Sequence, residues 1–265
     1  MACSVRGEVI GSVASRQARG ALLSAPYMWR AALAAASVAL AGCASGGDGT
    51  GGRATPPAAS AFRPTPASAP APVQRAPVAL FNGTDLAGWT PFLPGGNPAA
   101  TWTVADGVLR CTGEPAGYIA TDATYTSFIL ELEWRFDPAK GAGNSGVLLR
   151  VQPPDEVWPM SMEAQLMSGR AGDIWNIGDF PMVTDPSRTS GRHTAMEGES
   201  SERPLGEWNR YRIVVDGPVL ELYVNGALRN RATGCRIVPG RIALQSEGAW
   251  IEFRGITLTP LPDGG

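Results

Sequence analysis

The sequence predicts an all-β domain over residues 77–262, built as a two-sheet sandwich or jelly roll. Short apolar runs with a period of two recur along this part of the chain, as expected for half-buried strands. Asn-Gly and Asp-Gly pairs separate several of these runs and are strong hairpin signals. No amphipathic helical pattern of useful length interrupts them. Many short strands joined by frequent turns are typical of two packed sheets.

The chain before this domain predicts export and a lipid anchor. Met28-Trp29-Arg30 precedes an apolar run over 31–40, and Leu40-Ala41-Gly42-Cys43 follows. A basic start, a short apolar core and small residues form a secretory signal that is too short to span a bilayer. The last four residues resemble a bacterial lipobox, which implies cleavage before Cys43 and lipid on its thiol. An ordinary signal peptide with an incidental cysteine is the alternative.

The resemblance also implies where the protein resides. Ala44 follows the cysteine, which implies the outer membrane, periplasmic face, of the cell envelope. Residues 1–27 are interpreted as an over-extended start or a long leader, with Met28 as the true start. Residues 44–76 are rich in Ala, Pro, Gly, Ser and Thr, and are predicted to form a disordered tether.

Charge and cysteine usage restrict the function classes. The formal net charge is −2, so the chain lacks the basic footprint of a nucleic-acid-binding protein. Outside the leader and Cys43, the cysteines are Cys111 and Cys235. In an oxidising compartment these two could pair as a disulfide or stay free, and their spacing is not that of a zinc site.

The first half of the domain contains several predicted strands. Residues 78–81 form a short strand, and Thr84 could cap one helical turn that ends near Trp89. Residues 102–111 form the clearest hairpin, because Asp-Gly separates two apolar runs. Residues 118–120 form another short strand. In residues 128–136 apolar side chains alternate with charged ones, which predicts a long strand whose Glu131 and Glu133 lie on a solvated face.

The stretch from Gly143 to Gln165 combines two apolar runs with polar side chains. The strand period places Leu148 and Arg150 on one side of the first run, opposite to Val147, Leu149 and Val151. In the second run the same period separates Ser161, Glu163 and Gln165 from Met162, Ala164 and Leu166. If the sheet buries the apolar set and is concave on its other face, Glu163 and Gln165 form a polar floor for a ligand.

The rest of the domain is predicted as a long loop followed by a series of strands. Residues 174–177 form a short strand, and residues 178–203 form a polar loop that contains His193, the only histidine. A loop of this length is usually functional or disordered. The strands that follow are expected over 211–215, 220–224, 227–232, 241–246 and 250–258. The alternation changes phase at Gly255, as a bulge would cause.

Several blocks resemble a known family. They are LFNGTDLAGW over 80–89, NSGV over 144–147 with Arg150, EAQL over 163–166, GEWN over 206–209, NG over 225–226, IALQ over 242–245 and EFRGI over 252–256. In order, they are similar to the bacterial 3-keto-disaccharide hydrolase domain, also described as 3-keto-glucoside 1,2-lyase and 3-keto-2-hydroxyglucal hydratase. The resemblance covers nearly all of residues 79–259 and implies a concanavalin-like jelly roll. The chain departs from the pattern in a longer segment over 170–194 and in Gly255, where Asn is usual.

The resemblance implies a substrate oxidised at C3 of a glucosyl unit, as in a 3-keto-glucoside or 3-keto-disaccharide. The ketone acidifies the hydrogen on C2, so a base can remove it and the group on C1 can leave by elimination. Water then adds back, which gives net hydrolysis. This route needs a base, stabilisation of an enediolate and an acid for the leaving oxygen. One divalent metal ion could supply the stabilisation.

Candidate residues follow from this chemistry. Glu163 is the first candidate, as base or metal ligand. Arg150 could polarise an oxygen or pair with Glu163, and His193 could be a base, a ligand or simply solvated. Further metal candidates are the carboxylates Asp173, Asp179 and Glu202. The candidates for sugar binding are Asn144, Gln165, Gln245 and Trp175.

Two non-catalytic functions compete with the enzyme. The same jelly roll could be a carbohydrate-binding module, which needs aromatic platforms but no acid and base. It could also be a tethered interaction domain of the envelope. Fold alone does not separate these functions.

Overall fold

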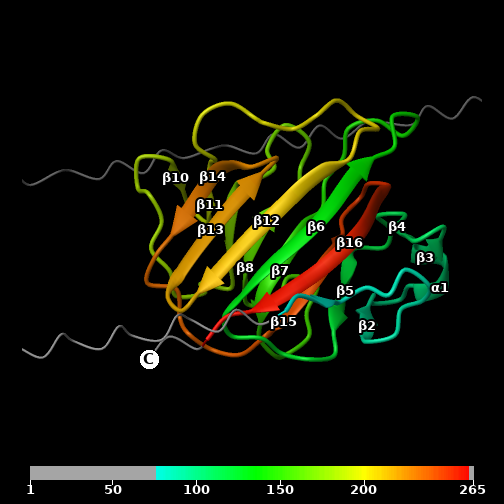
Figure 1. Cartoon of the computed structure of the whole chain (residues 1–265), viewed down its shortest axis with the longest axis horizontal. Helices are drawn as coiled ribbons and strands as arrows, with labels where there is room; N and C mark the ends of the chain where they lie inside the picture. The colour runs from blue at the N-terminus through cyan, green and yellow to red at the C-terminus, as the bar shows by residue number, and fades with distance from the viewer. Residues whose placement is uncertain (1–75, 263–265) are drawn as a thin grey trace, which may run out of the picture. The chain divides into compact units, whose positions relative to one another are not determined.

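Two antiparallel sheets make up the protein in the computed structural model, which describes residues 76–262. The front sheet of Figure 1 contains, in spatial order, β14 (Ala227–Ala232), β13 (Val219–Val224), β12 (Asn209–Asp216), β6 (Phe128–Phe136), β16 (Ile251–Pro260), β4 (Val108–Cys111) and β3 (Trp102–Ala105). The short β1 (Val78–Ala79) pairs with β16. One short helix, α1 (Pro98–Thr101), precedes β3.

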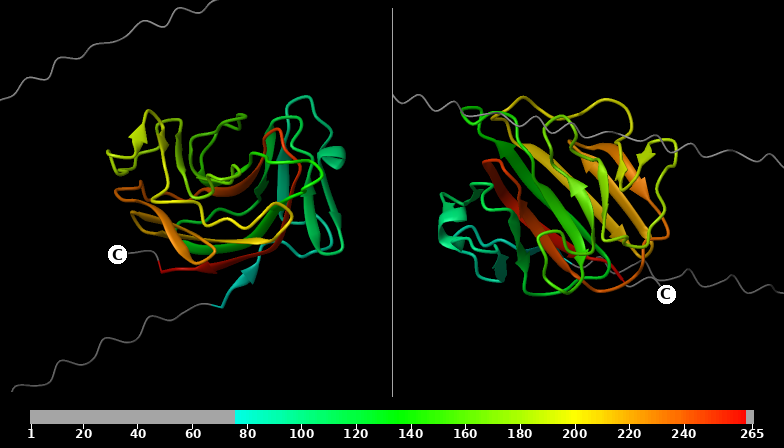
Figure 2. Two further views of the ribbon diagram at one scale, coloured as in Figure 1. Left: turned by 90° about the horizontal axis from the view of Figure 1, so that it is seen from above. Right: turned by 180° about the vertical axis from the view of Figure 1, so that it is seen from behind.

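The back sheet carries the polar stretch singled out in the sequence. Its order is β10 (Thr189–Ser190), β11 (His193–Thr194), β9 (Ile174–Ile177), β8 (Ser161–Gln165), β7 (Gly146–Val151), β15 (Arg241–Ser246), β5 (Gly117–Thr121) and β2 (Trp89–Phe92). Both sheets join strands that are distant in sequence, which Figure 2 shows as green strands beside orange and red ones. The predicted all-β jelly-roll sandwich is confirmed.

The main core lies between the sheets and follows the predicted alternation. In β6 every second residue from Phe128 to Phe136 is apolar and buried, while the residues between them are only partly buried. In β8 Met162 and Ala164 join the same core, and Leu166 follows them. Glu163 and Gln165 therefore lie on the opposite face of the back sheet, as the strand period predicts.

Several turns and one bulge also follow the prediction. Asp106-Gly107 joins β3 to β4, and Asn225-Gly226 joins β13 to β14. Gly217-Pro218 joins β12 to β13, one residue later than the predicted Asp216-Gly217 turn. Asp106 and Asn225 have positive φ, as does the glycine after each of them, which suits the tight hairpin turns. The register of β16 against β6 shifts between Arg254 and Thr257, where Gly255 has φ of 60°.

Two local predictions were wrong. No helical turn forms from Thr84 to Trp89; bends lead instead into β2. The polar segment over 178–203 is not only a loop, because β10 and β11 extend the back sheet within it. Of the two alternatives left open for Cys111 and Cys235, the structure shows the second: both cysteines are free and buried. Cys111 packs in the core, where burial raises the pKa of its thiol to about 11.

The outer face of the front sheet is a set of ion pairs. Glu133 accepts a hydrogen bond from Arg254 at 2.7 Å, and Glu131 accepts one from Arg210 at 2.6 Å. The guanidinium groups of Arg135 and Arg254 both stack on the Trp208 ring, at 4.5 and 4.1 Å from its centroid. The charged side chains of this face pair with one another and do not line the core. This agrees with the solvated face predicted for Glu131 and Glu133.

The predictions for residues 1–75 lie outside the described residues. They are the leader with its start at Met28, the lipobox with Cys43, and most of the tether over 44–76. Within residues 76–262 no helix is long and apolar enough to span a bilayer.

Candidate active site

A hollow of about 260 Å³ opens on the outer face of the back sheet. Five polar side chains line it: Asn144, Glu163, Gln165, Arg192 and Glu247. Four apolar side chains complete the wall: Trp158, Met167, Trp175 and Ile177. A hollow that combines aromatic and aliphatic side chains with convergent polar groups is a common form of a small-molecule site.

The floor of the hollow depends on a glycine in the middle strand. β7 lies between β8 and β15, so Gly146 separates Glu163 on one side from Gln245 on the other. A Cβ atom on Gly146 would lie 2.5 Å from Glu163 Oε1 and would also overlap Gln245 Oε1. The missing side chain therefore lets a carboxyl and an amide meet over the middle strand.

The immediate neighbours of Glu163 remove it from water. Leu148 lies directly opposite in β7 and Trp175 directly opposite in β9, and both share the Glu163 face of the sheet. Glu163 is only 5% exposed. Burial, reinforced by the negative charge of Glu247, raises the pKa of Glu163 to about 8, although the Gln245 amide and the Arg192 charge offset part of the rise.

A second carboxyl group, Glu247, lines the same hollow and was missed in the sequence. It follows β15, and burial raises its pKa to about 7. Its Oε2 atom is buried and has no hydrogen-bond partner among the described residues. The sequence contains a signal for this residue. Glu247 lies two residues after Gln245, which is the same spacing as that between Glu163 and Gln165, so the strand period would place it on the same face.

Amide groups around the carboxyls lack partners. Asn144 Oδ1 and both polar atoms of the fully buried Gln245 side chain accept or donate no hydrogen bond within residues 76–262. The Gln245 amide thus acts on Glu163 as a nearby dipole. Gln165 differs, since its Oε1 accepts from the amides of Leu166 at 2.9 Å and Met167 at 3.0 Å, which leaves Nε2 for a ligand. Buried polar atoms without partners indicate a site that a polar ligand completes.

Tryptophan side chains form part of the rim. Trp158 is 42% exposed in the segment that connects β7 with β8, and Trp175 comes from β9. Exposed aromatic faces next to polar groups suit a sugar ring, whose C–H face packs on indole while its hydroxyls form hydrogen bonds. Trp158 was not among the predicted residues. The Pro-rich segment around it gave no strand pattern from which its direction could be inferred.

His193 and Asp173 form a pair beside the hollow. His193 Nε2 lies 2.6 Å from Asp173 Oδ2, and the His193 ring packs against Trp175 with centroids 4.8 Å apart. Asp173 Oδ1 also accepts from the Met196 amide at 2.7 Å. His193 does not line the hollow, so in the structure it supports Trp175 rather than the position of a base.

Arg150 lies away from the site, which corrects its predicted catalytic role. It has φ of 52°, and the pairing of β15 with β7 shifts register next to it. The change in direction buries its side chain completely, where it donates hydrogen bonds to the carbonyls of Thr126, Arg236 and Gly217. Val151 correspondingly joins Leu148 on the outer face, not Val147 and Leu149 in the core.

The predicted metal ligands are not brought together. Asp173 is held by His193 and the Met196 amide, and Asp179 lies on an exposed turn. Glu202 Oε1 accepts from the Ala171 amide at 3.0 Å. Among residues 76–262 no three His, Cys, Asp or Glu side chains are grouped as a metal would require. The predicted set therefore does not fit a metal site.

Comparison with known proteins identifies the family. Residues 76–259 match the family described as the 3-keto-alpha-glucoside-1,2-lyase-like domain. A proposed glycosyl hydrolase from Parabacteroides distasonis has a similar structure, with a TM-score of 0.53 and 21% identity over 70% of this chain and 94% of that one. A β-glucanase from Bacillus licheniformis gives a TM-score of 0.50 and 13% identity over 71% of this chain and 99% of the other. Both show the fold alone. No curated protein matches the chain.

Proposed function

Because this chain belongs to the family of 3-keto-alpha-glucoside-1,2-lyase-like domains, we propose that it is an enzyme that cleaves glucosides oxidised at C3. The family and the fold support a carbohydrate-active protein, and the site supports the finer assignment. One observation carries it: two carboxyl groups with raised pKa values, Glu163 and Glu247, share a hollow with unpartnered amides.

The reaction requires two proton transfers at adjacent carbons. Removal of the C2 hydrogen needs a carboxylate, and departure of the oxygen on C1 needs an acid. No covalent nucleophile takes part. The unpartnered Gln245 Nε2, together with Gln165 Nε2, can donate hydrogen bonds to the oxygens on C2 and C3, where negative charge develops. Asn144 Oδ1 can accept a hydrogen bond from a sugar hydroxyl.

The two carboxyl groups can supply base and acid at the same pH. Their pKa values of about 8 for Glu163 and about 7 for Glu247 mean that, between these values, the pair carries one proton. One group is then a carboxylate while the other is a carboxylic acid. The proposal therefore expects kcat/KM to be highest near pH 7 to 8 and to fall on both sides.

The same two carboxyls favour a second candidate function. A pair of carboxyl groups in one sugar-sized hollow is also the arrangement of a glycosidase that acts on unoxidised sugars. The rim tryptophans would in turn suit a binding module without activity. The proposed elimination requires the 3-keto group of the substrate, whereas neither a glycosidase nor a binding module does.

The test compares matched substrates. The purified domain over residues 76–262 is incubated with a 3-keto-glucosyl disaccharide and with its unoxidised form, and sugar release is followed by chromatography. The proposal expects release only from the oxidised substrate, with deuterium from D₂O incorporated at C2. Equal release from both forms would indicate a glycosidase. Binding of the oxidised sugar without any release would indicate a binding module.

The location of this activity is a proposal that rests on residues outside the structure. The lipobox-like sequence ending in Cys43 supports a lipid anchor, with the outer membrane of the cell envelope as its site. The anchored domain would then meet oxidised sugars in the periplasm. No nucleic-acid partner is expected from a net charge of −2.

A further inference from the structure

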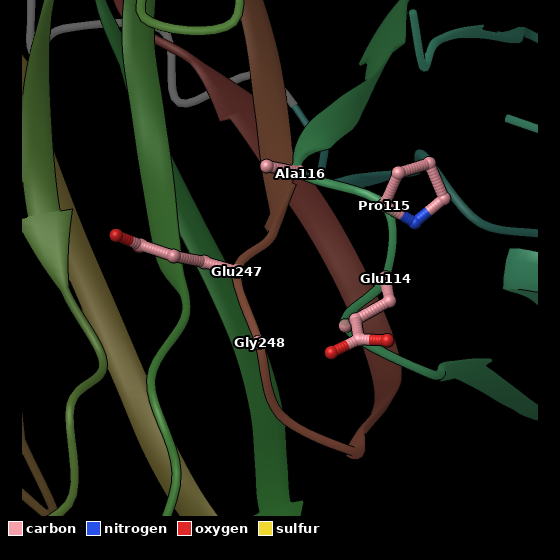
Figure 3. Close-up of a pocket in the computed structure, with 6 residues that line it drawn as sticks. Glu114, Pro115, Ala116, Glu247 and Gly248 are labelled. Carbon is pink, nitrogen blue, oxygen red and sulfur yellow. The ribbon is translucent and has the colours of Figure 1, made fainter. Parts of the chain in front are cut away.

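A second hollow lies next to the first. It has a volume of about 730 Å³ and is lined by Gly113, Glu114, Pro115, Ala116, Glu247 and Gly248 (Figure 3). Glu247 lines both hollows. Figure 3 shows the Glu247 side chain pointing away from Glu114 and Pro115, which come from the separate segment before β5. Glu247 thus belongs to the common wall, the part of the lining that the two hollows share.

Two hydrogen bonds and one close backbone contact hold the walls of the second hollow in place. The Gly248 amide donates to the Gly113 carbonyl at 2.6 Å, and the Ser246 hydroxyl donates to the Pro115 carbonyl at 2.8 Å. Gly113 has φ of 85°, and a Cβ atom there would overlap the backbone of Ala249. This close contact fixes the segment that follows β4 against the segment that follows β15, so the hollow exists before a ligand binds.

We infer that the second hollow holds the leaving group of the substrate, a second sugar ring or another alcohol, and that Glu247 protonates the leaving oxygen. The inference rests on the proposed function and adds where the substrate extends. If the oxidised ring occupies the first hollow, the bond to C1 must cross the common wall to reach the second. Glu247 lies at that crossing, whereas Glu163 lies on the floor of the first hollow.

The proton transfers balance under this assignment. Glu163 carboxylate takes the proton from C2, the C1–O bond breaks, and the leaving oxygen takes the proton of Glu247. The product in the first hollow is a ring with a C1–C2 double bond conjugated to the C3 ketone. Water adds to C1 as Glu247 takes its proton, and Glu163 returns a proton to C2. Both carboxyls end in their initial state.

In the ligand-free protein the shared proton favours the other carboxyl group, Glu163, over the assigned acid, Glu247. The more buried Glu163 has the higher of the two pKa values and holds the shared proton more strongly. The arrangement with the proton on Glu247 is therefore the less populated one in the ligand-free protein. Contacts between the substrate and the two hollows can offset this preference.

The acid assignment is tested by Glu247→Gln with three oxidised substrates that differ only in the leaving group. A disaccharide and a methyl glycoside leave as alcohols and need a proton, whereas 4-nitrophenolate leaves without one. We expect kcat/KM to fall at least 100-fold for the first two and less than about fivefold for the nitrophenyl glycoside, after subtraction of spontaneous release. Equal losses for all three would overturn the assignment of Glu247 as the acid.

The assignment of the second hollow as the site of the leaving group is tested by Ala116→Trp. Ala116 is exposed and lines this hollow, so a tryptophan there narrows it. We expect the KM of the disaccharide to rise at least tenfold and that of the methyl glycoside to change much less. Ala123→Trp is the matched control, because Ala123 is also exposed but lines neither hollow. Equal effects of Ala116→Trp on both substrates would overturn the leaving-group site.

These outcomes separate the inference from the proposed function. A wild-type domain that cleaves none of the oxidised substrates overturns the proposed function. A wild-type domain that cleaves them, with variants that do not discriminate between leaving groups, overturns only the inference.

Discussion

Glu163 owes its chemistry to its strand neighbours. The strand period directs it away from the core, yet Leu148 and Trp175 flank it with apolar side chains, and the absence of a side chain on Gly146 brings it close to the Gln245 amide. A carboxyl group in such a place favours its neutral form, and the nearby Glu247 charge acts in the same direction. Raised pKa values of this kind occur preferentially at functional sites.

The first prediction concerns the catalytic role of this residue. Glu163→Gln keeps the size and polarity of the side chain but removes its ability to accept a proton. We expect kcat/KM for the 3-keto disaccharide to fall about 10²- to 10⁴-fold, the range for loss of a general base. Glu207→Gln is the matched control on an exposed carboxylate and should keep full activity. Full activity in Glu163→Gln would rule out the assigned base.

The second prediction concerns stability and pH. The folded pKa of Glu163 is about 8, above its ordinary value of 4.5, so folding favours the protonated form. Its contribution is fully present below about pH 4.5 and is lost as pH rises through 8, on the order of a few kcal/mol. Thermal melts should show wild-type stability declining over this window, and Glu163→Gln should decline less. Parallel curves for the two proteins would contradict the raised pKa.

At the scale of elements, β7 shows both where the strand period predicts side-chain direction correctly and where it fails. The alternation in the sequence correctly assigns Val147 and Leu149 to the core and Leu148 to the outer face. It fails at Arg150, because a residue with φ of 52° breaks the period and turns its side chain inward. The sequence contains no glycine or turn pair at this point, so the irregularity could not be predicted from it.

The third prediction tests the glycine at the centre of the site. In Gly146→Ala the new Cβ must displace the Glu163 carboxyl and the Gln245 amide, since both lie too close to it. The backbone there is an ordinary strand, so we expect the melting temperature to change by only a few degrees. We expect kcat/KM to fall roughly 100-fold, as for small misplacement of reacting groups. A variant with unchanged kinetics would show that the two side chains need not converge.

The fourth prediction tests the structural role of Arg150. Arg150→Met removes the donor to the buried Gly217 carbonyl and to the part-buried carbonyls of Thr126 and Arg236, and we expect a loss of about 3 kcal/mol or more. For a domain of this size that corresponds to a fall in melting temperature of roughly 6–12 °C. Arg236→Met, on an exposed side chain, should change it by little. Below the melting range the KM of Arg150→Met should equal that of the wild type, whereas a raised KM would restore Arg150 to the site.

At the scale of the whole molecule, the sequence predicted sheets better than loops. Strand residues are constrained by a local period, and the bounds of β6, β9, β14 and β15 coincide with the predicted ranges. The carboxylates Asp173, Asp179 and Glu202 come from connecting segments, whose positions depend on packing between distant strands. The same limit explains why Arg192 and Trp158, which reach the hollow from such segments, were not predicted.

The fifth prediction concerns the full chain and its anchor. If the lipobox-like sequence is processed, Cys43 becomes the first residue and carries the lipid that holds the domain to the membrane. Cys43→Ser should then move the protein from the membrane fraction to the soluble fraction of a bacterial host. The activity per molecule should stay unchanged, because the acyl site precedes the domain over 76–262. Cys3→Ser is the control and should remain with the membranes, since Cys3 lies before the proposed start at Met28. Membrane association that survives Cys43→Ser would exclude a lipid anchor at this residue while leaving the proposed chemistry intact.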